Sequence, residues 1–290
     1  MKLDGRRESA NVEDRRRMSG GTAAGLGLGG ILVVGLITLL MGGNIGDVIQ
    51  NVQNVGGLGA GTVTTENREF TPEEEALAKF SGQILASTED VWSSYFKQNG
   101  IGTYRNPTLV LYTNATATGC GTGQAAMGPF YCSADENLYI DLSFFSTMKR
   151  SLGADGDFAY AYVIAHEVGH HVQNLVGTLG QAHSQMARMS KTDANRMSVR
   201  IELQADFYAG VWAHYEGSMF GSLDDGDLQE AINCASVIGD DYLQKKSQGY
   251  AVEESFTHGT AAQRMRWLKK GMTTGDMSQG NTFKLADNQL

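Results

Sequence analysis

Two histidines at helical spacing are the first feature of this sequence that could do chemistry. His166 and His170 are four residues apart, so on an α-helix their imidazoles project from one face and can hold one metal ion. Glu167 directly follows the first histidine, within reach of a water molecule on such a metal. Hydrolytic zinc sites need nitrogen ligands, an open coordination position and a nearby base. The segment therefore predicts a zinc centre with Glu167 as the catalytic general base.

A second predicted helix offers a third ligand, which a catalytic zinc ion requires. Glu202 and Asp206 are again four residues apart and share a helix face. We expect Glu202 to complete a site of two histidines and one glutamate, with one Zn²⁺ per chain. Asp206 is expected to accept the free ring N–H of His166 or His170, which would fix the tautomer of that ligand. For Glu202 alone, a solvent-exposed helix acid is the competing interpretation.

The elements that must position these residues form a pattern of strands followed by helices, which indicates an α+β domain. The folded part is expected to begin where Thr71 caps a helix whose first residue is Pro72. That helix is amphipathic and is predicted to end near Gly100. Strands are predicted at 108–113 and 138–142, and helices at 157–176, 194–216, 226–246 and 259–270.

The charge of the chain argues against binding to nucleic acid. The 290 residues carry a formal net charge of −9. Residues 1–18 hold six of the basic and four of the acidic side chains, so the remainder is more acidic than the whole. A body of that charge would repel a phosphate backbone.

An uncharged segment near the N-terminus predicts a membrane anchor. About 20 apolar residues span a bilayer as a helix, and residues 22–43 fit that length without a charged side chain. The cluster Arg15-Arg16-Arg17 precedes the segment directly, which by the positive-inside rule places the N-terminus in the cytoplasm and the rest outside. A cleaved signal peptide is the alternative interpretation. The expected partner of residues 22–43 is the lipid bilayer.

The predicted organisation has four parts, of which the third is rich in Gly, Asn, Gln, Val and Thr. They are a cytoplasmic basic tail (1–21), a transmembrane anchor (22–43), a flexible linker (44–70) and a zinc metallopeptidase domain (71–290).

Two of the three cysteines bracket a Gly-rich segment beside the predicted strands. In an oxidising compartment Cys120 and Cys132 would close this segment with a disulfide. A cysteine metal site is the alternative, but two thiols without a second pair make a poor one. Cys234 lies among apolar residues of a predicted helix and is expected to be buried and inert.

Several motifs together carry a family resemblance. The segment from His166 to His170, followed by Glu202-x-x-Ala205-Asp206, resembles the gluzincin class of zinc peptidases. Other segments are similar to those of the bacterial neutral zinc metallopeptidases of the YpfJ type, over most of the chain including its basic tail and anchor. They are Gly128-Pro129-Phe130-Tyr131-Cys132, Tyr139-Ile140-Asp141-Leu142-Ser143-Phe144-Phe145, and Phe256-Thr257-His258-Gly259-Thr260 with Gln263-Arg264.

The resemblance implies a fold and a location. The fold is a zincin-like α+β domain, with a small sheet and helices that carry the HExxH and ExxxD motifs, behind a single N-terminal transmembrane helix. The location is the bacterial inner membrane, crossed once, with the N-terminus in the cytoplasm and the catalytic domain in the periplasm.

The resemblance also implies roles for residues outside the two helices. By similarity to gluzincins, the strand at 138–142 would line the active-site cleft and pair with an extended substrate. His258 would hydrogen-bond the oxyanion of the tetrahedral intermediate, and Arg264 would orient Glu202 or Asp206. The alternatives are that His258 caps the following helix and that Arg264 is an ordinary helix cation.

The function predicted from the sequence is that of a membrane-anchored zinc metalloendopeptidase. It would hydrolyse bonds in a peptide or protein substrate with metal-activated water and Glu167 as general base. A membrane-tethered, non-catalytic zinc-binding interaction module is the alternative from another class, although such a module needs no base. A hydrolase that acts on a non-peptide amide would share the same site.

Overall fold

A four-stranded sheet underlies the domain in the computed structural model, which describes residues 1–19, 64–65 and 69–290. Its strand order is β1-β4-β8-β7; the first three strands run parallel, and β7 is antiparallel to β8. Two pairs of short strands, β2 with β3 and β5 with β6, form separate antiparallel ladders. The strands are β1 (Val12–Asp14), β2 (Met18–Ser19), β3 (Thr64–Thr65), β4 (Thr108–Tyr112), β5 (Ala115–Thr118), β6 (Gly121–Gln124), β7 (Phe130–Cys132) and β8 (Asn137–Asp141).

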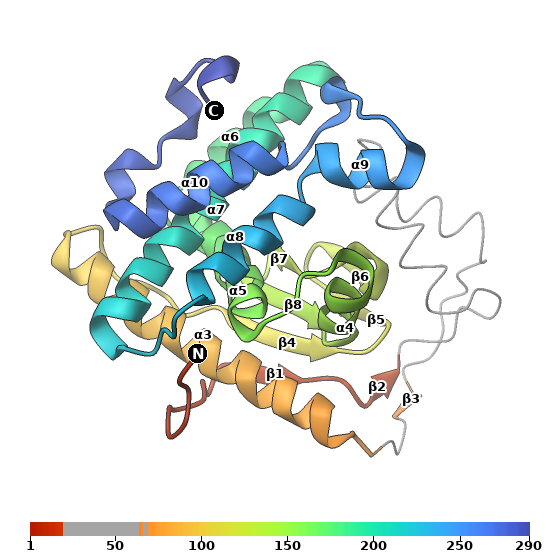
Figure 1. Ribbon diagram of the computed structural model, residues 1–290, viewed down its shortest axis with the longest axis vertical. Helices are drawn as coiled ribbons and strands as arrows, with labels where there is room; N and C mark the ends of the chain where they lie inside the picture. Colours follow the sequence, from red (N-terminus) through yellow and green to blue (C-terminus); the bar gives the residue numbers. More distant parts are fainter. Residues whose placement is uncertain (20–63, 66–68) are drawn as a thin grey trace.

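Helices make up most of the described chain (Figure 1). Helices α3 and α5 share one hydrophobic core with the sheet and contact each other, α7 packs on both of them, and α10 packs on α7. They are α3 (Pro72–Gln98), α4 (Ser143–Thr147), α5 (Asp157–Leu175), α6 (Thr178–Met186), α7 (Lys191–Phe220), α8 (Asp227–Val237), α9 (Asp240–Gln248) and α10 (Ala261–Thr274). Short turns of 3-10 or π geometry are η1 (Ala125–Met127), η2 (Met148–Leu152), η3 (Glu253–Ser255), η4 (Met277–Gln279), η5 (Thr282–Lys284) and η6 (Asp287–Gln289).

Helix α3 begins where local chemistry predicts. The Thr71 hydroxyl accepts from the Glu74 backbone N–H (3.2 Å), and the Glu74 carboxylate accepts from the Thr71 N–H (2.8 Å). This reciprocal capping satisfies two backbone donors that the first turn would leave free, and Pro72 follows at the first helical position. Further along the helix, Trp92 is fully buried and joins the main core. The α+β core predicted from the sequence is therefore present.

The predicted helix over 226–246 is two helices in the structure, α8 and α9. The chain breaks at Gly239, where an added Cβ would lie 2.2 Å from the backbone nitrogen of Ala261. Only glycine allows the start of α10 to approach this closely. The break places Asp240 at the beginning of α9, beside the loop that precedes α10.

The structure contradicts the single-pass membrane arrangement, both as part of the fold and as a location. Among the residues that the structure describes, no helix has the length and apolar character needed to cross a membrane. The predicted span at 22–43 and most of the predicted linker at 44–70 lie outside the described residues.

The position of the N-terminal residues gives the physical reason for this correction. Strand β1 pairs with β4 in one ladder, in the register Val12 to Leu109. Nearby, Arg6 donates to the buried carboxylate of Glu216 in α7 (2.8 Å). A single crossing between β1 and β4 would put them on opposite sides of a bilayer, where they could not share backbone hydrogen bonds. Basic residues before the segment are ion-paired within the fold, as Arg16 is with Asp14 (2.6 Å).

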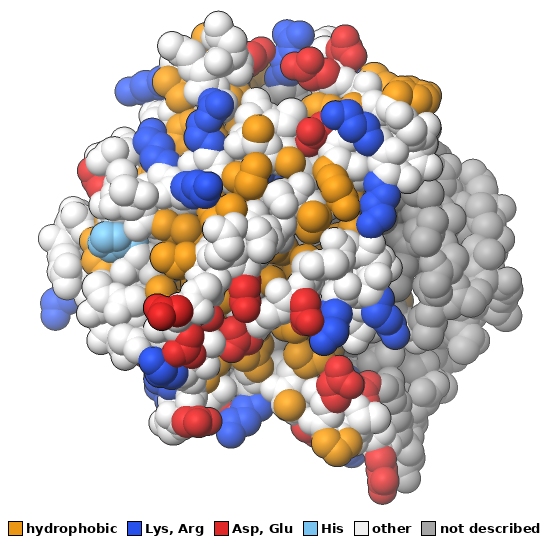
Figure 2. Space-filling model, in the orientation of Figure 1, with side chains coloured by type: hydrophobic (Ala, Val, Ile, Leu, Met, Phe, Trp, Pro, Cys, Tyr) orange, Lys and Arg blue, Asp and Glu red, His pale blue; other side chains and the backbone are white. Residues whose placement is uncertain are grey.

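The surface mixes the two signs of charge. Figure 2 shows acidic and basic side chains interspersed on one face of the molecule, with apolar side chains between them. Some of these charges form ion pairs, such as Lys2 with Asp224 (2.8 Å). Pairs of this kind on an exposed surface contribute about 0–1 kcal/mol each, so the stability of the fold rests on its core.

Candidate metal centre

Helices α5 and α7 bring the three predicted ligands together. The Nε2 atom of His166 lies 3.1 Å from Oε2 of Glu202, and that of His170 lies 3.5 Å from the same oxygen. One ligand atom from each residue falls within 4.8 Å of the other two. In a tetrahedral zinc site with bonds of about 2.0–2.1 Å, neighbouring ligand atoms are roughly 3.3 Å apart. The donor types and their spacing therefore fit a zinc ion.

A glycine lets the two ligand helices approach each other. A Cβ on Gly169 would lie 2.8 Å from the carbonyl oxygen of Ala205 and 3.1 Å from its Cα. Gly169 lies between His166 and His170 on α5, and Ala205 lies between Glu202 and Asp206 on α7. The two helix backbones are therefore in contact beside the candidate metal centre. This contact lets side chains from both helices reach the same place.

Asp206 fixes the ring of His166 by binding its Nδ1 nitrogen, on the side away from Glu202. Its buried carboxylate, with 0% exposure, accepts from Nδ1–H of His166 (2.8 Å) and from the Tyr162 hydroxyl (2.5 Å). Arg264 on α10 donates to it through two nitrogens, each at 2.9 Å. A partner that can only accept keeps a proton on Nδ1, so Nε2 is the nitrogen that can bind a metal once it gives up its own proton.

The same contacts decide two alternatives left open by the sequence. Arg264 is buried and donates to Asp206, so it is not an ordinary helix cation. The N-cap of α10 is Thr260, which forms a capping box with Gln263. His258 therefore does not cap this helix.

His170 is held by a residue that the sequence analysis missed. Its Nδ1 lies 2.9 Å from Oε1 of Gln173, a buried amide three residues further along α5. The spacing of three on one helix was the available signal, because it places Gln173 beside His170. The two histidine ligands thus have different partners, a carboxylate for His166 and an amide for His170.

The electrostatics of the centre favour a cation. Burial lowers the pKa of His166, but Asp206 and Glu202 outweigh it and raise this pKa to about 10. For Glu202, burial acts in the opposite direction, but His170 and His166 hold its pKa well below the usual range. The carboxylates therefore create a negative potential at the point where the three ligand atoms meet, and a divalent metal ion would be attracted there.

Glu167 is the buried carboxylate without a hydrogen bond to any described residue of the site. It is 7% exposed and lines the same cavity as the ligands. Burial raises the pKa of its carboxyl group, and the nearby rings of His170 and His166 oppose that shift. Because no hydrogen bond from a described residue engages it, its oxygens can act on a molecule in the cavity.

His258 faces this cavity from the loop before α10, and Asp240 positions the loop. The Asp240 carboxylate accepts from the backbone N–H groups of Thr257 (2.7 Å), His258 (2.7 Å) and Gly259 (3.0 Å). It also lies 3.2 Å from Nδ1 of His258. Burial lowers the pKa of His258, but Asp240 and Glu202 raise it overall. Asp240 is a site residue that sequence reasoning missed, because its partner His258 lies 18 residues later, on another loop.

The cavity is open and mostly apolar outside the metal centre. Its volume is about 460 Å³. One wall comes from the segment between Cys120 and Cys132, and others from α4, η2 and the junction of α8 with α9. Apolar side chains on these walls include Met127, Phe130, Phe144, Met148, Ile238 and Leu243. Such a cavity suits a ligand with bulky apolar groups.

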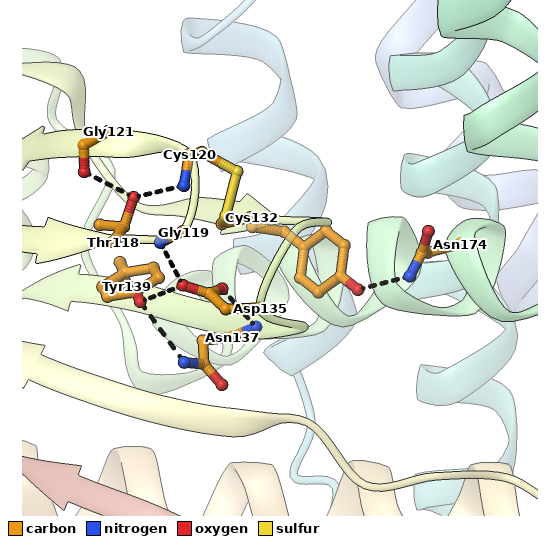
Figure 3. Close-up of a disulfide and its surroundings, with 10 residues drawn as sticks. Thr118, Gly119, Cys120, Gly121, Cys132, Asp135, Asn137, Tyr139 and Asn174 are labelled. Carbon is orange, nitrogen blue, oxygen red and sulfur yellow. Dashed lines mark hydrogen bonds between the residues drawn. A yellow bond between two sulfur atoms is a disulfide. The ribbon is translucent and has the colours of Figure 1, made fainter.

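The predicted disulfide is present (Figure 3). It links two segments that form one wall of the cavity. Cys120, at the turn between β5 and β6, is bonded to Cys132 on β7. Asp135 holds the same turn by accepting from the Gly119 N–H (2.6 Å), and it also accepts from the Tyr139 hydroxyl (2.7 Å). Cys234 is a buried free cysteine, as predicted.

The prediction that the strand at 138–142 pairs with a substrate is wrong, because this strand is not at the edge of the sheet. Strand β8, which matches the predicted 138–142 strand, lies between β4 and β7. Its backbone is therefore paired on both sides over Asn137–Tyr139, and no residue of β8 lines the cavity. Strand β7 ends the sheet, and its residues Phe130 and Tyr131 line the cavity.

The remaining histidines lie outside the ligand set. His171 is buried on the other side of α5, where its ring nitrogens contact the Tyr131 hydroxyl (3.0 Å) and the Arg105 carbonyl (2.6 Å). His183 is exposed at the edge of the cavity, and His214 contacts the Met272 carbonyl (2.9 Å).

Another group of acids lies close together in the part of the chain that the structure describes. It consists of Asp157, Asp227 and Glu230, near the start of α5. The group contains no histidine or cysteine, and Glu230 accepts from the Phe158 N–H (3.1 Å). Nitrogen and sulfur donors dominate protein zinc sites, so the centre at His166 is the candidate.

The chain is similar to uncharacterized proteins of two bacteria. The uncharacterized protein YpfJ of Escherichia coli (strain K12) is 49% identical over 293 residues, which cover 98% of this chain and 99% of that protein. The uncharacterized protein Rv2575 of Mycobacterium tuberculosis is 41% identical over 194 residues, 63% of this chain and 64% of that protein. No solved structure matches the chain.

A family model described as "Putative neutral zinc metallopeptidase" matches residues 1–283. That match includes both ligand helices and the His258 loop, and the description of the family implies zinc as the metal. The chain therefore belongs to the putative neutral zinc metallopeptidase family.

Proposed function

We propose that this chain is a zinc-dependent metalloendopeptidase, with one Zn²⁺ held by His166, His170 and Glu202. The observation that carries the proposal is the arrangement around Glu167. Three ligand atoms of zinc-binding type converge beside a carboxylate that no described residue engages, inside an open cavity. A structural zinc site closes its fourth position with a protein ligand, whereas a catalytic one leaves it open.

The chemistry can be divided between the metal and the chain. When bound, zinc acts as a Lewis acid that makes a coordinated water acidic, with a pKa near 7, and polarises a substrate carbonyl. Glu167 takes the proton from the attacking water and then delivers it to the departing amine. Burial raises the pKa of this carboxyl group, which suits a residue that must hold a proton between the two steps.

His258 is proposed to stabilise the negative charge that develops on the carbonyl oxygen. Asp240 lies against its Nδ1 and favours the protonated ring, so Nε2 can donate a hydrogen bond into the cavity. Asp206 and Arg264 do not contact the substrate in this proposal. They hold the His166 ring in the orientation and tautomer that a metal ligand needs.

The cavity favours cleavage inside a substrate peptide over removal of residues from the ends of that peptide. A protease that trims termini needs a charged group to hold the terminal amine or carboxylate. Among the described residues that line the cavity, the carboxylates are Glu167 and Glu202, which the proposal assigns to the zinc chemistry. The arginine or lysine present there is Arg264, and Asp206 engages it. The end of the sheet at β7 offers a strand edge along one wall, to which an extended peptide can add.

The non-catalytic zinc module is the weaker candidate. A module of that kind has no use for a buried carboxylate beside the metal, and burying one without a partner costs free energy. Glu167 would then be a costly residue without a role. Hydrolysis of a non-peptide amide would use the same groups, so a peptide test separates that candidate from the proposal.

The experiment compares wild type with Glu167→Gln on a peptide library of mixed sequence. The variant should retain stoichiometric zinc and lose cleavage by at least about 100-fold, since a general base contributes about 10²–10⁴. Cleavage by wild type should stop with a chelator and return with zinc. Glu253→Gln changes an exposed glutamate outside the cavity and serves as the matched control. Full cleavage by Glu167→Gln would refute the role of this residue, and zinc binding without any wild-type cleavage would favour the module.

A further inference from the structure

Two buried glutamines connect the metal centre to the C-terminal part of the chain. Gln173 on α5 is 0% exposed and Gln204 on α7 is 5% exposed. A buried side-chain amide has to satisfy both its donor and its acceptor end, because an unpaired buried polar group is costly. The orientation of each amide therefore follows from the neighbours that can only accept.

The chain of contacts starts at a backbone carbonyl. The Gly280 oxygen can only accept, and Nε2 of Gln204 lies 2.9 Å from it. This contact turns Oε1 of Gln204 towards Gln173, where it accepts from Nε2 (3.1 Å). The same Nε2 donates to the Ile201 carbonyl (2.7 Å). Two acceptors thus hold the amino end of Gln173 against α7.

The acceptor end of Gln173 is left to face His170. Its Oε1 lies 2.9 Å from Nδ1 of the ring, so that nitrogen must carry the proton. The other ring nitrogen, Nε2, then has its lone pair free on the side of Glu202, 3.5 Å from the Oε2 atom. The reverse orientation of the amide would set Oε1 of Gln173 against the Ile201 carbonyl, two acceptors in contact.

We propose that Gln173 and Gln204 are positioning residues that fix the Nδ1–H tautomer of His170 and thereby raise the affinity of the centre for zinc. The inference rests on the proposed metal site. Asp206 performs the same task for His166 with a charged group, whereas the two amides do so without adding charge. An amide is needed at 173 because the side chain accepts on one side and donates to two oxygens on the other. Neither a carboxylate nor an apolar side chain can do both.

Gln204 gives the sharper test, because the contacts of its amide are with Gln173 and Gly280 and not with the ligand atoms. Replacement by Met keeps the length of the side chain but removes both hydrogen bonds, which frees the Gln173 amide to turn. We expect Gln204→Met and Gln173→Met each to weaken zinc binding by about 10- to 100-fold. Gln229→Met, at an exposed position on α8, should leave the affinity unchanged.

The measurement is competition for zinc between the full chain and a chromophoric chelator, with thermal unfolding recorded on the same samples. A second readout is the imidazole nitrogen spectrum of His170 in the zinc-loaded chain. In wild type it should show metal at Nε2 and a proton on Nδ1 that exchanges slowly with water. In Gln173→Met that proton has lost its acceptor and should exchange faster. If one variant fails to fold, the other carries the test.

The outcomes separate this inference from the proposed function. If wild type binds zinc and both glutamine variants keep the same affinity and the same Nδ1–H exchange rate, the positioning role is overturned. A spectrum with metal at Nδ1 of His170 would overturn it as well. If wild type binds no zinc while it is folded, the proposed metal site itself fails.

Discussion

The ring of His166 and the carboxylate of Asp206 meet 2.8 Å apart across the interface of α5 and α7. This contact joins the two helices that carry the candidate ligands, and Arg264 reinforces it from α10. Three helices from distant parts of the chain therefore share one buried charge network. Metal binding and fold stability should depend on it together.

Asp206→Asn tests this network. An asparagine has one acceptor oxygen and no charge, so it leaves the buried Arg264 guanidinium without this counter-ion, and breaking a buried pair in this way costs about 3–5 kcal/mol. Zinc affinity should fall about 10- to 100-fold as His166 loses its charged acceptor. Urea unfolding and chelator competition measure the two effects. Asp225→Asn, an exposed position, is the control, and equal stability of both variants would contradict the prediction.

Zinc binding should release protons at neutral pH. Burial lowers the pKa of His166, but Asp206 and Glu202 raise it to about 10, so without metal the ring is protonated at pH 7.5. Zinc must displace that proton. Titration calorimetry in buffers of different ionisation enthalpy should count at least one proton released per zinc at pH 7.5, and fewer as the pH passes about 10. Zinc binding with no proton release at pH 7.5 would refute this assignment.

The same shift predicts a pH dependence of stability in the metal-free chain. The folded pKa of His166 is raised above its unfolded value of about 6.5. The stabilisation from this group is therefore full below about pH 6.5 and is lost as the pH rises through about 10. Denaturant unfolding in the presence of a chelator, at pH 6, 8 and 10, measures it. A variant His166→Asn should lack this component of the pH dependence.

Gly169→Ala should disturb the crossing of the ligand helices. The new Cβ would lie 2.8 Å from the Ala205 carbonyl oxygen, so α5 and α7 must separate. Overpacking of this kind costs about 1–3 kcal/mol, and zinc affinity should decrease with it. At Gly180 in α6, by contrast, an added Cβ meets no atom within 4 Å, and Gly180→Ala should stabilise by up to about 1 kcal/mol. Equal effects of the two substitutions would contradict the close packing.

Loss of the disulfide should affect substrate binding more than metal binding. The Cys120–Cys132 bond closes the wall of the cavity, whereas the ligands lie on α5 and α7. Opening a loop of this length costs about 3 kcal/mol in the chain-entropy model. The double variant Cys120→Ala/Cys132→Ala should have a higher KM with unchanged zinc content. Wild type should respond to a reductant in the same way, and the double variant should not respond. A parallel loss of zinc would show that the wall also supports the metal centre.

Local chemistry explains what the sequence could predict about the fold. Helical geometry alone puts residues four apart on one face, so the pairs His166 with His170 and Glu202 with Asp206 were recognisable as ligand groups. The start of α3 was predictable for the same reason, because Thr71 and Glu74 cap it within one turn. The Cys120–Cys132 pairing is a short-range contact as well.

Long-range pairing explains where the sequence misled. An uncharged segment after three arginines indicated a membrane anchor, yet β1 in front of that segment pairs with β4 almost a hundred residues later. The hydropathy of a short stretch of sequence carries no information about which distant strand a neighbouring strand pairs with. The choice of β8 as the substrate strand failed similarly, because an edge position exists only once the sheet is assembled.

The sequence by itself determined which residues could serve as metal ligands and as the base. The tertiary structure decided which side chain holds each ligand in place: Asp206 for His166, Gln173 for His170 and Asp240 for the loop of His258. The physical reason is the difference in range. The geometry of the α-helix sets which residues share the face of one helix. The close packing of Gly169 on Ala205 sets which residues of the two helices meet.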